Sequence, residues 1–167
     1  AFVVVPMFVL MGAFASTSGM TSEMYTAAHR LFSGMRGGLY YTTVLASAAF
    51  GAVSGSTIVA GAVFTRIAFP EMMRYGYKRS LSAGCIAAAG TFAALIPPSI
   101  SMVIYGILTG ESIGALLMAG LVPGLVTVVA YMLGIRLILW RRPQWVPEVQ
   151  RRLPPREILS SFRGLWA

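Results

Sequence analysis

Long apolar stretches, separated by short polar segments, make up most of the chain up to residue 140. A helix that spans a membrane needs about 20 predominantly apolar residues. The stretches 80–108 and 112–140 meet that length, and residues 1–19 could supply most of a further crossing that begins inside a helix. The pattern therefore predicts an all-α membrane protein.

Residues 21–36 follow a different pattern, with apolar side chains at helical spacing and polar side chains between them. The apolar positions are Met24, Ala28, Leu31 and Met35, and the polar ones are Glu23, His29, Arg30 and Arg36. Such a helix has one apolar face and is typical of helices that lie along a membrane surface. We expect an interfacial helix here, which Gly37-Gly38 ends.

Two of the apolar stretches contain a break in the middle. Residues 39–53 and 57–69 are each too short to span, and they flank Ser54-Gly55-Ser56-Thr57. They predict a re-entrant helical hairpin with its tip near mid-membrane. The second break is Ile96-Pro97-Pro98-Ser99, because proline lacks an amide donor and disfavours helical geometry at the preceding residue. Lipid cannot satisfy an unwound backbone, so such breaks usually line a binding site.

This pattern divides the chain into four parts. They are a partial transmembrane helix with an interfacial arm helix (1–36), a re-entrant hairpin with a cytoplasmic loop (37–79), a broken transmembrane helix with the transmembrane helix that follows it (80–140), and a basic cytoplasmic linker (141–167). Within the second part, residues 70–79 are expected to form a polar loop. Pro123-Gly124 predicts a bend in the last crossing.

Basic residues set the orientation, since short cytoplasmic loops carry an excess of lysine and arginine. If the hairpin enters from the cytoplasm, the basic loop 70–79 and the tail from 141 both lie inside. The only short outer loop, 109–112, then carries just Glu111. A single complete crossing over 39–69 would instead place the basic loop outside, so the hairpin is preferred.

Composition agrees with a membrane setting and excludes several functions. The chain is 57% hydrophobic and 11% charged, whereas soluble domains carry about a quarter charged residues. The net charge of +8 is gathered at segment ends and in the tail, without the basic stripe that binds nucleic acid. A single cysteine, Cys85, excludes an intramolecular disulfide. We find no carboxylate pair, nucleophile with a base, or metal-ligand cluster, so an enzyme is not expected.

The residues at both breaks offer groups that can bind a cation and a carboxylate. The last carbonyls of a helix that stops at Ser54 favour a cation, and the free amides where helices restart near Thr57 and Ser99 favour a carboxylate. Gly55 permits a tight reversal. We therefore expect all eight residues of the two breaks to bind substrate or ion and to lie close together; the residues are Ser54, Gly55, Ser56, Thr57, Ile96, Pro97, Pro98 and Ser99.

Sodium fits these breaks better than protons do. All five acidic residues fall at segment ends, in loops or in the tail, so no buried carboxylate is offered as a proton relay. Neutral oxygens suit a hard cation, and the candidate sodium ligands are Ser54, Ser56 and Pro97. No cofactor is expected besides sodium as the coupling ion. The structural alternative is that the small residues only allow close helix packing.

Several motifs follow one another along the chain: Pro6-Met7-Phe8-Val9-Leu10-Met11-Gly12, Gly37-Gly38-Leu39, Ser54-Gly55-Ser56, Pro70-Glu71-Met72-Met73 with Gly76-Tyr77, Ile96-Pro97-Pro98-Ser99, Tyr105-Gly106, and Ala119-Gly120 with Pro123-Gly124. In this order and over nearly the whole chain, they resemble the large membrane subunit (DctM-type) of TRAP transporters. The resemblance implies an ion-transporter-like fold of two inverted repeats, of which this chain covers about the first. One repeat alone is not expected to transport.

The resemblance also implies a function and partners. Family members import carboxylates such as C4-dicarboxylates or sialic acids with sodium, by an elevator mechanism, across the inner (cytoplasmic) membrane of bacteria or archaea. Their partners are a small membrane subunit and an extracytoplasmic substrate-binding protein, with membrane lipid as the surroundings of a multi-pass chain. Two other functions stay open, because re-entrant helices also build pores: a pore-forming channel subunit, and a membrane assembly subunit that transports nothing.

Overall fold

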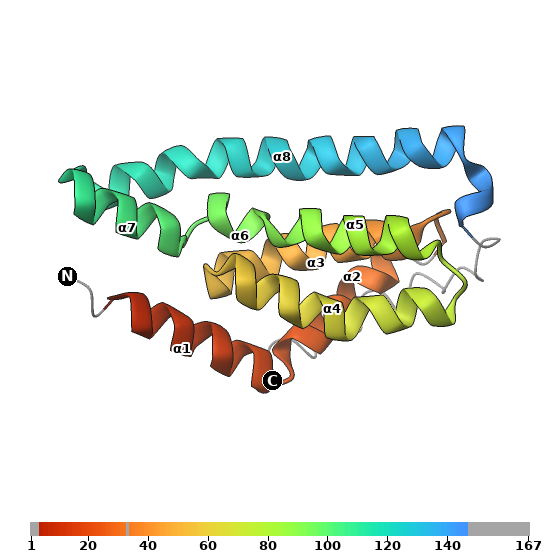
Figure 1. Ribbon diagram of the computed structural model, residues 1–167, viewed down its shortest axis with the longest axis horizontal. Coiled ribbons are helices and arrows are strands. Elements are labelled where there is room, and N and C mark those ends of the chain that lie inside the picture. The colour runs from red at the N-terminus through yellow and green to blue at the C-terminus, as the bar shows by residue number, and fades with distance from the viewer. Residues whose placement is uncertain (1–3, 33, 147–167) are drawn as a thin grey trace.

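The computed structural model of the protein describes residues 4–32 and 34–146. Every regular element among these residues is helical, which confirms the all-α prediction for this part of the chain. The helices are α1 Val4–Thr17, α2 Met20–Phe32, α3 Gly38–Ser54, α4 Thr57–Arg74, α5 Arg79–Gly90, α6 Phe92–Leu95, α7 Ile100–Thr109, α8 Ile113–Arg141 and the 3₁₀ helix η1 Pro143–Trp145 (Figure 1). Most of the predicted linker 141–167 lies outside the described residues.

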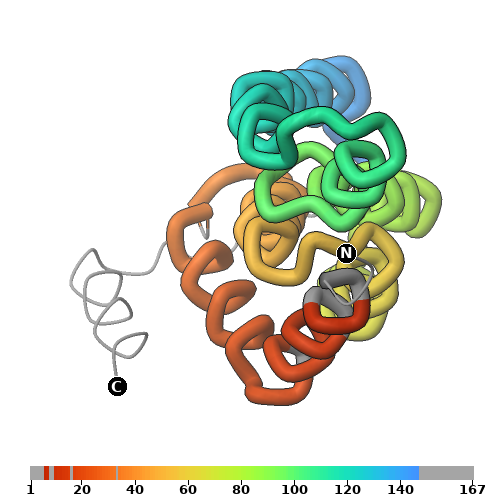
Figure 2. The backbone as a smooth tube through the Cα atoms, turned by 90° about the vertical axis from the view of Figure 1, so that its left-hand side faces the viewer, coloured from red at the N-terminus to blue at the C-terminus, as the bar shows by residue number. Residues whose placement is uncertain are grey.

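The helices run back and forth along one long axis. Helices α3 and α4 form an antiparallel hairpin, and α5 packs against both of them (Figure 1). The chain continues through α6 and α7, turns at residues 110–112, and returns as α8 beside α7, α6 and α3. Seen along the axis in Figure 2, α8 lies on one side and α1 on the opposite side, with α3 to α6 between them. Both helix breaks therefore lie in the middle layer.

The hairpin is much shorter than the last helix. Helix α8 has 29 residues and α3 has 17, which at the usual rise correspond to roughly 43 Å and roughly 26 Å. The hairpin tip accordingly lies partway along α8 (Figure 1). Among the described residues, α8 is long and apolar enough to cross a membrane alone, and Arg79–Leu95 with Ile100–Thr109 pass the same test together, bent by 42°.

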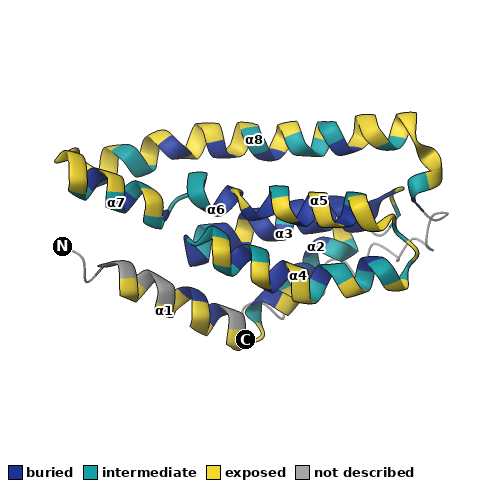
Figure 3. Cartoon of the chain, viewed as in Figure 1, coloured by how far each residue is buried: buried dark blue, intermediate teal, exposed yellow. Residues whose placement is uncertain are grey.

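Helix α3 forms the centre of the core, and α8 forms an outer wall. The aromatic side chains of Tyr40, Phe50 and Phe64 are completely buried, and the last two meet edge to face with ring centroids 5.9 Å apart. Large aromatic side chains dominate core energetics because each removes so much surface from solvent. In contrast, Leu125 and Leu133 on α8 stay exposed, and Figure 3 shows much of that helix in the yellow of exposed residues. Such a face suits contact with lipid.

The prediction of a loop over residues 70–79 is wrong for residues 70–74. Helix α4 continues through Pro70 to Arg74, and only residues 75–78 separate it from α5. Proline inside a helix removes one hydrogen bond. The helix persists because Ala68 and Met72, on either side of Pro70, are completely buried in the core.

Two further boundaries differ from the sequence prediction. The interfacial helix ends at Phe32 instead of 36, and Gly38 already belongs to α3. Gly37 has a φ of 77°, and its neighbour Gly38 packs directly on the Phe32 carbonyl, so both glycines turn the chain sharply. An additional interruption occurs at Thr91, whose hydroxyl donates to the Ala88 carbonyl at 2.7 Å. Helix α8 runs without interruption through Pro123.

Candidate ion and substrate site at two helix breaks

The first break is a tight reversal between α3 and α4. Gly55 has a φ of 60°, the left-handed region that glycine enters without steric cost, and its amide donates to the Gly51 carbonyl at 2.9 Å. Ser56 then begins α4, because its hydroxyl accepts the Val59 amide at 3.4 Å. Only two residues thus separate the helices.

The second break separates α6 from α7. Ile96 is extended and buried, and the peptide bond between Pro97 and Pro98 is cis. The hydroxyl of buried Ser99 donates to the Ala94 carbonyl at 2.8 Å and accepts the Met102 amide at 3.4 Å. Ser99 therefore closes α6 and caps α7 with a single hydroxyl.

The two breaks contact each other directly. The Ile100 amide, in the first turn of α7, donates to the Gly55 carbonyl at 3.1 Å. A Cβ atom added at Gly55 would lie 2.6 Å from the Pro98 carbonyl oxygen, so only glycine fits there without a shift of backbone. The expectation that both breaks are near neighbours is confirmed. Their role in binding stays a prediction.

Ser54 differs from the other hydroxyl groups at this junction. It is completely buried, and its Oγ has no hydrogen-bond partner in the described part of the chain. A buried hydroxyl without a partner costs about 1–3 kcal/mol. Ser56 and Thr57 are half-buried, as are Pro97 and Pro98. Ser54 is thus the candidate whose oxygen is both enclosed and available.

Close packing of backbones surrounds the junction. A Cβ at Gly12 of α1 would lie 3.2 Å from the Ser54 Cβ, and one at Gly51 would lie 3.0 Å from the Ala93 Cα. On the other side, a Cβ at Gly124 of α8 would lie 2.9 Å from the Ile96 Cγ1. Small-residue packing therefore accompanies the breaks. Sequence reasoning missed Gly51 as a contact residue, because an isolated glycine within an apolar helix gives no sign of its partner.

The acidic side chains and the histidine of the described residues lie elsewhere. Glu23 belongs to α2, Glu71 to the last turn of α4, and Glu111 to the turn before α8. Burial lowers the pKa of His29 on α2, and the nearby charge of Glu71 opposes that change. No group of three histidine, cysteine or acidic residues is placed to hold a metal ion within the described residues. The polar groups that the junction offers are therefore neutral hydroxyls, carbonyls and amides.

The base of the hairpin is tied to the end of α8. The Lys78 ammonium lies 3.9 Å from the ring centroid of Trp145, and the Lys78 amide donates to the Trp145 carbonyl at 3.4 Å. The guanidinium of Arg142 lies 5.5 Å from the same ring. A cation over an indole ring is attracted by its negative face. These contacts join loop 75–78 to η1.

The whole chain matches a known family of membrane transport subunits. The family described as "Tripartite ATP-independent periplasmic transporter, DctM component" matches residues 1–167. The chain therefore belongs to the DctM family of TRAP large permeases, as the motifs predict. Its relatives are named as transport permeases, which points to transport and not to catalysis.

Several relatives, whose names give different transported acids, are between 31% and 39% identical to this chain. The chain is 39% identical over 163 residues to the C4-dicarboxylate TRAP transporter large permease protein DctM of Pseudomonas aeruginosa, covering 97% of this chain and 38% of that protein. It is 34% identical over 167 residues to the 2,3-diketo-L-gulonate TRAP transporter large permease protein YiaN of Escherichia coli, covering 98% and 38%. The sialic acid TRAP transporter large permease protein SiaM of Vibrio cholerae is 31% identical over 162 residues, covering 96% and 38%. The chain spans less than two-fifths of the length of these curated relatives.

Proposed function

We propose that this chain is the part of a TRAP large permease that binds sodium and an organic carboxylate during import across the inner membrane. The observation that carries the proposal is the meeting of two helix breaks beside the buried, unpartnered Ser54 hydroxyl. Sodium acts as the coupling ion, and no cofactor takes part. A small membrane subunit and an extracytoplasmic substrate-binding protein complete the transporter, as the tripartite family name supports.

The proposed sodium ligands are oxygens on both breaks. Hard cations prefer oxygen ligands, and the carbonyls in the last turn of α3 have no partner within that helix and carry its negative dipole end. The Ser54 hydroxyl adds an available oxygen. Ser56 keeps a second lone pair beside the one that caps α4. Pro97 adds a carbonyl from the facing break, so Ser54, Ser56 and Pro97 are the proposed set.

The proposed carboxylate site is the start of α4. Helix N-termini favour anions through their free amides and positive dipole end. The amide of Val59 is taken by Ser56, and the amide of Ile100 by Gly55. Within the described residues, the amides of Thr57 and Ile58 keep no such partner. Ile58 is also 82% exposed, which leaves room for a ligand beside it.

Charge and length support a re-entrant hairpin and a movement of the elevator type. The end that holds loop 75–78 and the end of α8 carries Lys78 and Arg141, whereas the opposite turn carries Glu111 (Figure 1). The positive-inside rule then makes the basic end cytoplasmic. A hairpin that enters from this side and stops partway along α8 would hold both breaks near mid-membrane. A site at that depth can be carried to either surface when the helices around it slide together.

Uptake by the complete permease tests the proposal. We expect Ser54→Ala to raise the sodium concentration needed for half-maximal carboxylate uptake about tenfold in proteoliposomes, because a hydrogen-bonding oxygen to a charged partner contributes roughly 1.5 kcal/mol. The assay contains the small subunit and the binding protein. Ser47→Ala is the matched control, since Ser47 lies on the same helix and is also buried with an unpartnered Oγ.

The outcomes separate the proposed carrier from the other functions. Equal sodium dependence in the Ser54 and Ser47 variants would remove Ser54 from the site. A channel subunit would conduct ions without the binding protein, and an assembly subunit would neither conduct nor give sodium-dependent uptake. A carrier gives saturable uptake that needs both sodium and the binding protein.

A further inference from the structure

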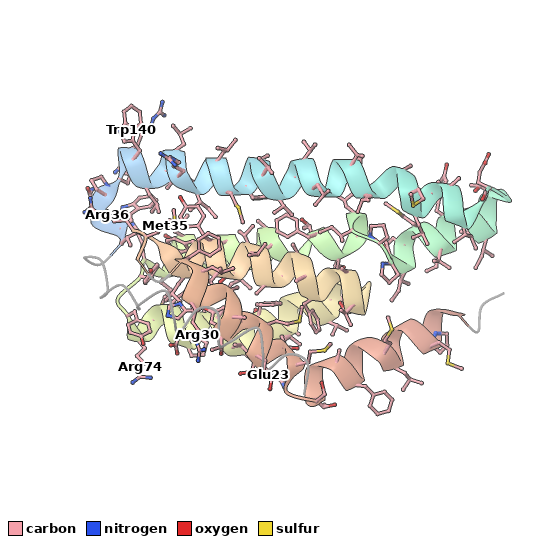
Figure 4. All side chains as sticks on the ribbon, turned by 180° about the vertical axis from the view of Figure 1, so that it is seen from behind. Glu23, Arg30, Met35, Arg36, Arg74 and Trp140 are labelled. Atoms are coloured by element: carbon pink, nitrogen blue, oxygen red, sulfur yellow. The ribbon has the colours of Figure 1, made fainter. Side chains whose placement is uncertain are left out.

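A cavity lies far from the breaks, at the end of α8. Its volume is about 550 Å³, and it opens between the segment after α2, the start of α3 and the last turns of α8. The lining side chains include two arginines, two aromatic residues and two apolar residues: Arg36, Arg136, Tyr41, Trp140, Met35 and Leu139. Figure 4 shows Met35, Arg36 and Trp140 gathered at this end of the molecule.

Two arginines bring positive charge to this cavity. Arg36 and Arg136 are both exposed, and neither forms an ion pair within the described residues. Arg136 is close enough to act electrostatically on the Tyr41 hydroxyl. A guanidinium group presents several N–H donors in a plane and binds phosphate in a bidentate manner. The cavity therefore favours a ligand with a phosphate group.

The rest of the lining is apolar or aromatic. Leu139 is half-buried and packs against Gly37, whereas Met35 is 47% exposed and Trp140 is 78% exposed. A soluble phosphate would leave these side chains without a partner. A lipid would cover them with the upper part of an acyl chain. The combination of charge and apolar surface thus suits an amphiphile better than a free ion.

The cavity lies at the level along α8 where lipid headgroups are expected. Arg136 precedes the end of α8 at Arg141 by five positions, or roughly 8 Å along the helix. Tryptophan and tyrosine gather where the hydrocarbon meets the headgroups. Basic pockets between transmembrane helices at the cytoplasmic side bind anionic headgroups.

We propose that this cavity binds the phosphate of an anionic phospholipid between Arg36 and Arg136, with the start of an acyl chain along Leu139 and Trp140. The site is distinct from the ion and substrate junction, which lies partway along α8. Lipid binding here would fasten the segment after α2 to the end of α8. It requires only that the protein is embedded in a membrane, and not that sodium is the coupling ion.

Competition between two lipids tests the site. The purified permease, with the subunits that copurify, is mixed with phosphatidylglycerol and phosphatidylcholine, and the retained lipid is counted by native mass spectrometry. We expect Arg36→Gln and Arg136→Gln each to reduce the preference for phosphatidylglycerol about fivefold, since one basic residue near an anionic lipid surface contributes roughly 1 kcal/mol. The matched control is Arg74→Gln with Arg79→Gln, two exposed arginines that do not line the cavity.

The results divide clearly. A preference lost in the two glutamine variants, kept in the control, and reduced but not lost in Arg36→Lys with Arg136→Lys supports the site, because lysine keeps the charge without the bidentate donors. Equal loss in the cavity and control variants would show general charge attraction and overturn it, as would no loss in any variant. Displacement of the lipid by equimolar glycerol phosphate would indicate a free-phosphate site and also overturn the proposal. Sodium-dependent uptake is measured separately, so a failed lipid test leaves the transport test intact.

Discussion

The two helix breaks use their buried serines in opposite ways. At the second break, Ser99 donates to the Ala94 carbonyl and accepts from the Met102 amide. At the first break, Ser54 is equally buried but its Oγ has no hydrogen-bond partner among residues 4–32 and 34–146. The difference indicates that the second break is held in shape by its own hydrogen bonds, whereas the first keeps an oxygen available for a ligand.

The largest expected effect comes from removing the glycine that joins the two breaks. Gly55→Ala forces a side chain into the left-handed region, at a cost of roughly 1–2 kcal/mol. Its Cβ would also lie 2.6 Å from the Pro98 carbonyl oxygen. We expect a large drop in thermal stability and loss of uptake.

Gly76→Ala is the control for this change. Gly76 also has a positive φ, of 76°, but a Cβ there would meet nothing within 4 Å. Gly76→Ala therefore measures the loss of thermal stability caused by backbone strain alone, without the contact between the breaks. If both alanine variants lose the same amount of thermal stability, the close approach to Pro98 contributes nothing.

An intermediate effect, a lower melting temperature, is expected from Ser99→Ala at the second break. Ser99→Ala removes a helix cap, worth about 1 kcal/mol, and a hydrogen bond to the Ala94 carbonyl, worth about another 1 kcal/mol. The melting temperature should fall equally with and without sodium. Ser54→Ala should instead leave the sodium-free melting temperature unchanged or higher, because it removes an unpartnered buried hydroxyl, and should reduce only the stabilisation by sodium.

Ser112→Ala is the control for the loss of a cap. Ser112 caps α8 through the Ala115 amide at 3.4 Å but is exposed. Its loss should cost less than the loss of Ser99. A Ser99 variant whose melting temperature falls only in sodium would contradict the structural role of that hydroxyl.

The smallest expected effect is that of Pro98→Ala. The substitution permits the chain near the second break to extend α7 backward and to withdraw carbonyls from the junction. We expect a rise of about twofold to threefold in the sodium concentration for half-maximal uptake, a lost weak ligand being worth roughly 0.5 kcal/mol. Pro123→Ala serves as the control, because Pro123 lies inside continuous α8. The proposal for Pro97 would be weakened if both variants behaved alike.

Much of the helical architecture follows from local patterns. The breaks at 54–57 and 96–99 were predictable because glycine and proline act on the backbone at their own positions. Pro70 shows the limit of such reasoning, since buried Ala68 and Met72 maintain a helix that proline alone would have ended. Packing between distant segments outweighs local propensity at such positions.

The candidate site was predictable in its location but not in its chemistry. Four hydroxyl-bearing residues occupy the breaks, and nothing in their order distinguishes Ser54 from Ser99. The distinction arises from the Ala94 carbonyl, which the fold brings to Ser99 and to no other hydroxyl at the junction. The bond between the Ile100 amide and the Gly55 carbonyl, in contrast to this local one, joins residues far apart in the sequence.

The contact between Lys78 and Trp145 has a consequence for the order of biosynthesis. Lys78 leaves the ribosome before α5, α6, α7 and α8, and Trp145 leaves it only after all four. Chains fold progressively from the N-terminus during synthesis. The base of the hairpin therefore lacks its contact with Trp145 until the following helices have been made, so this contact forms last.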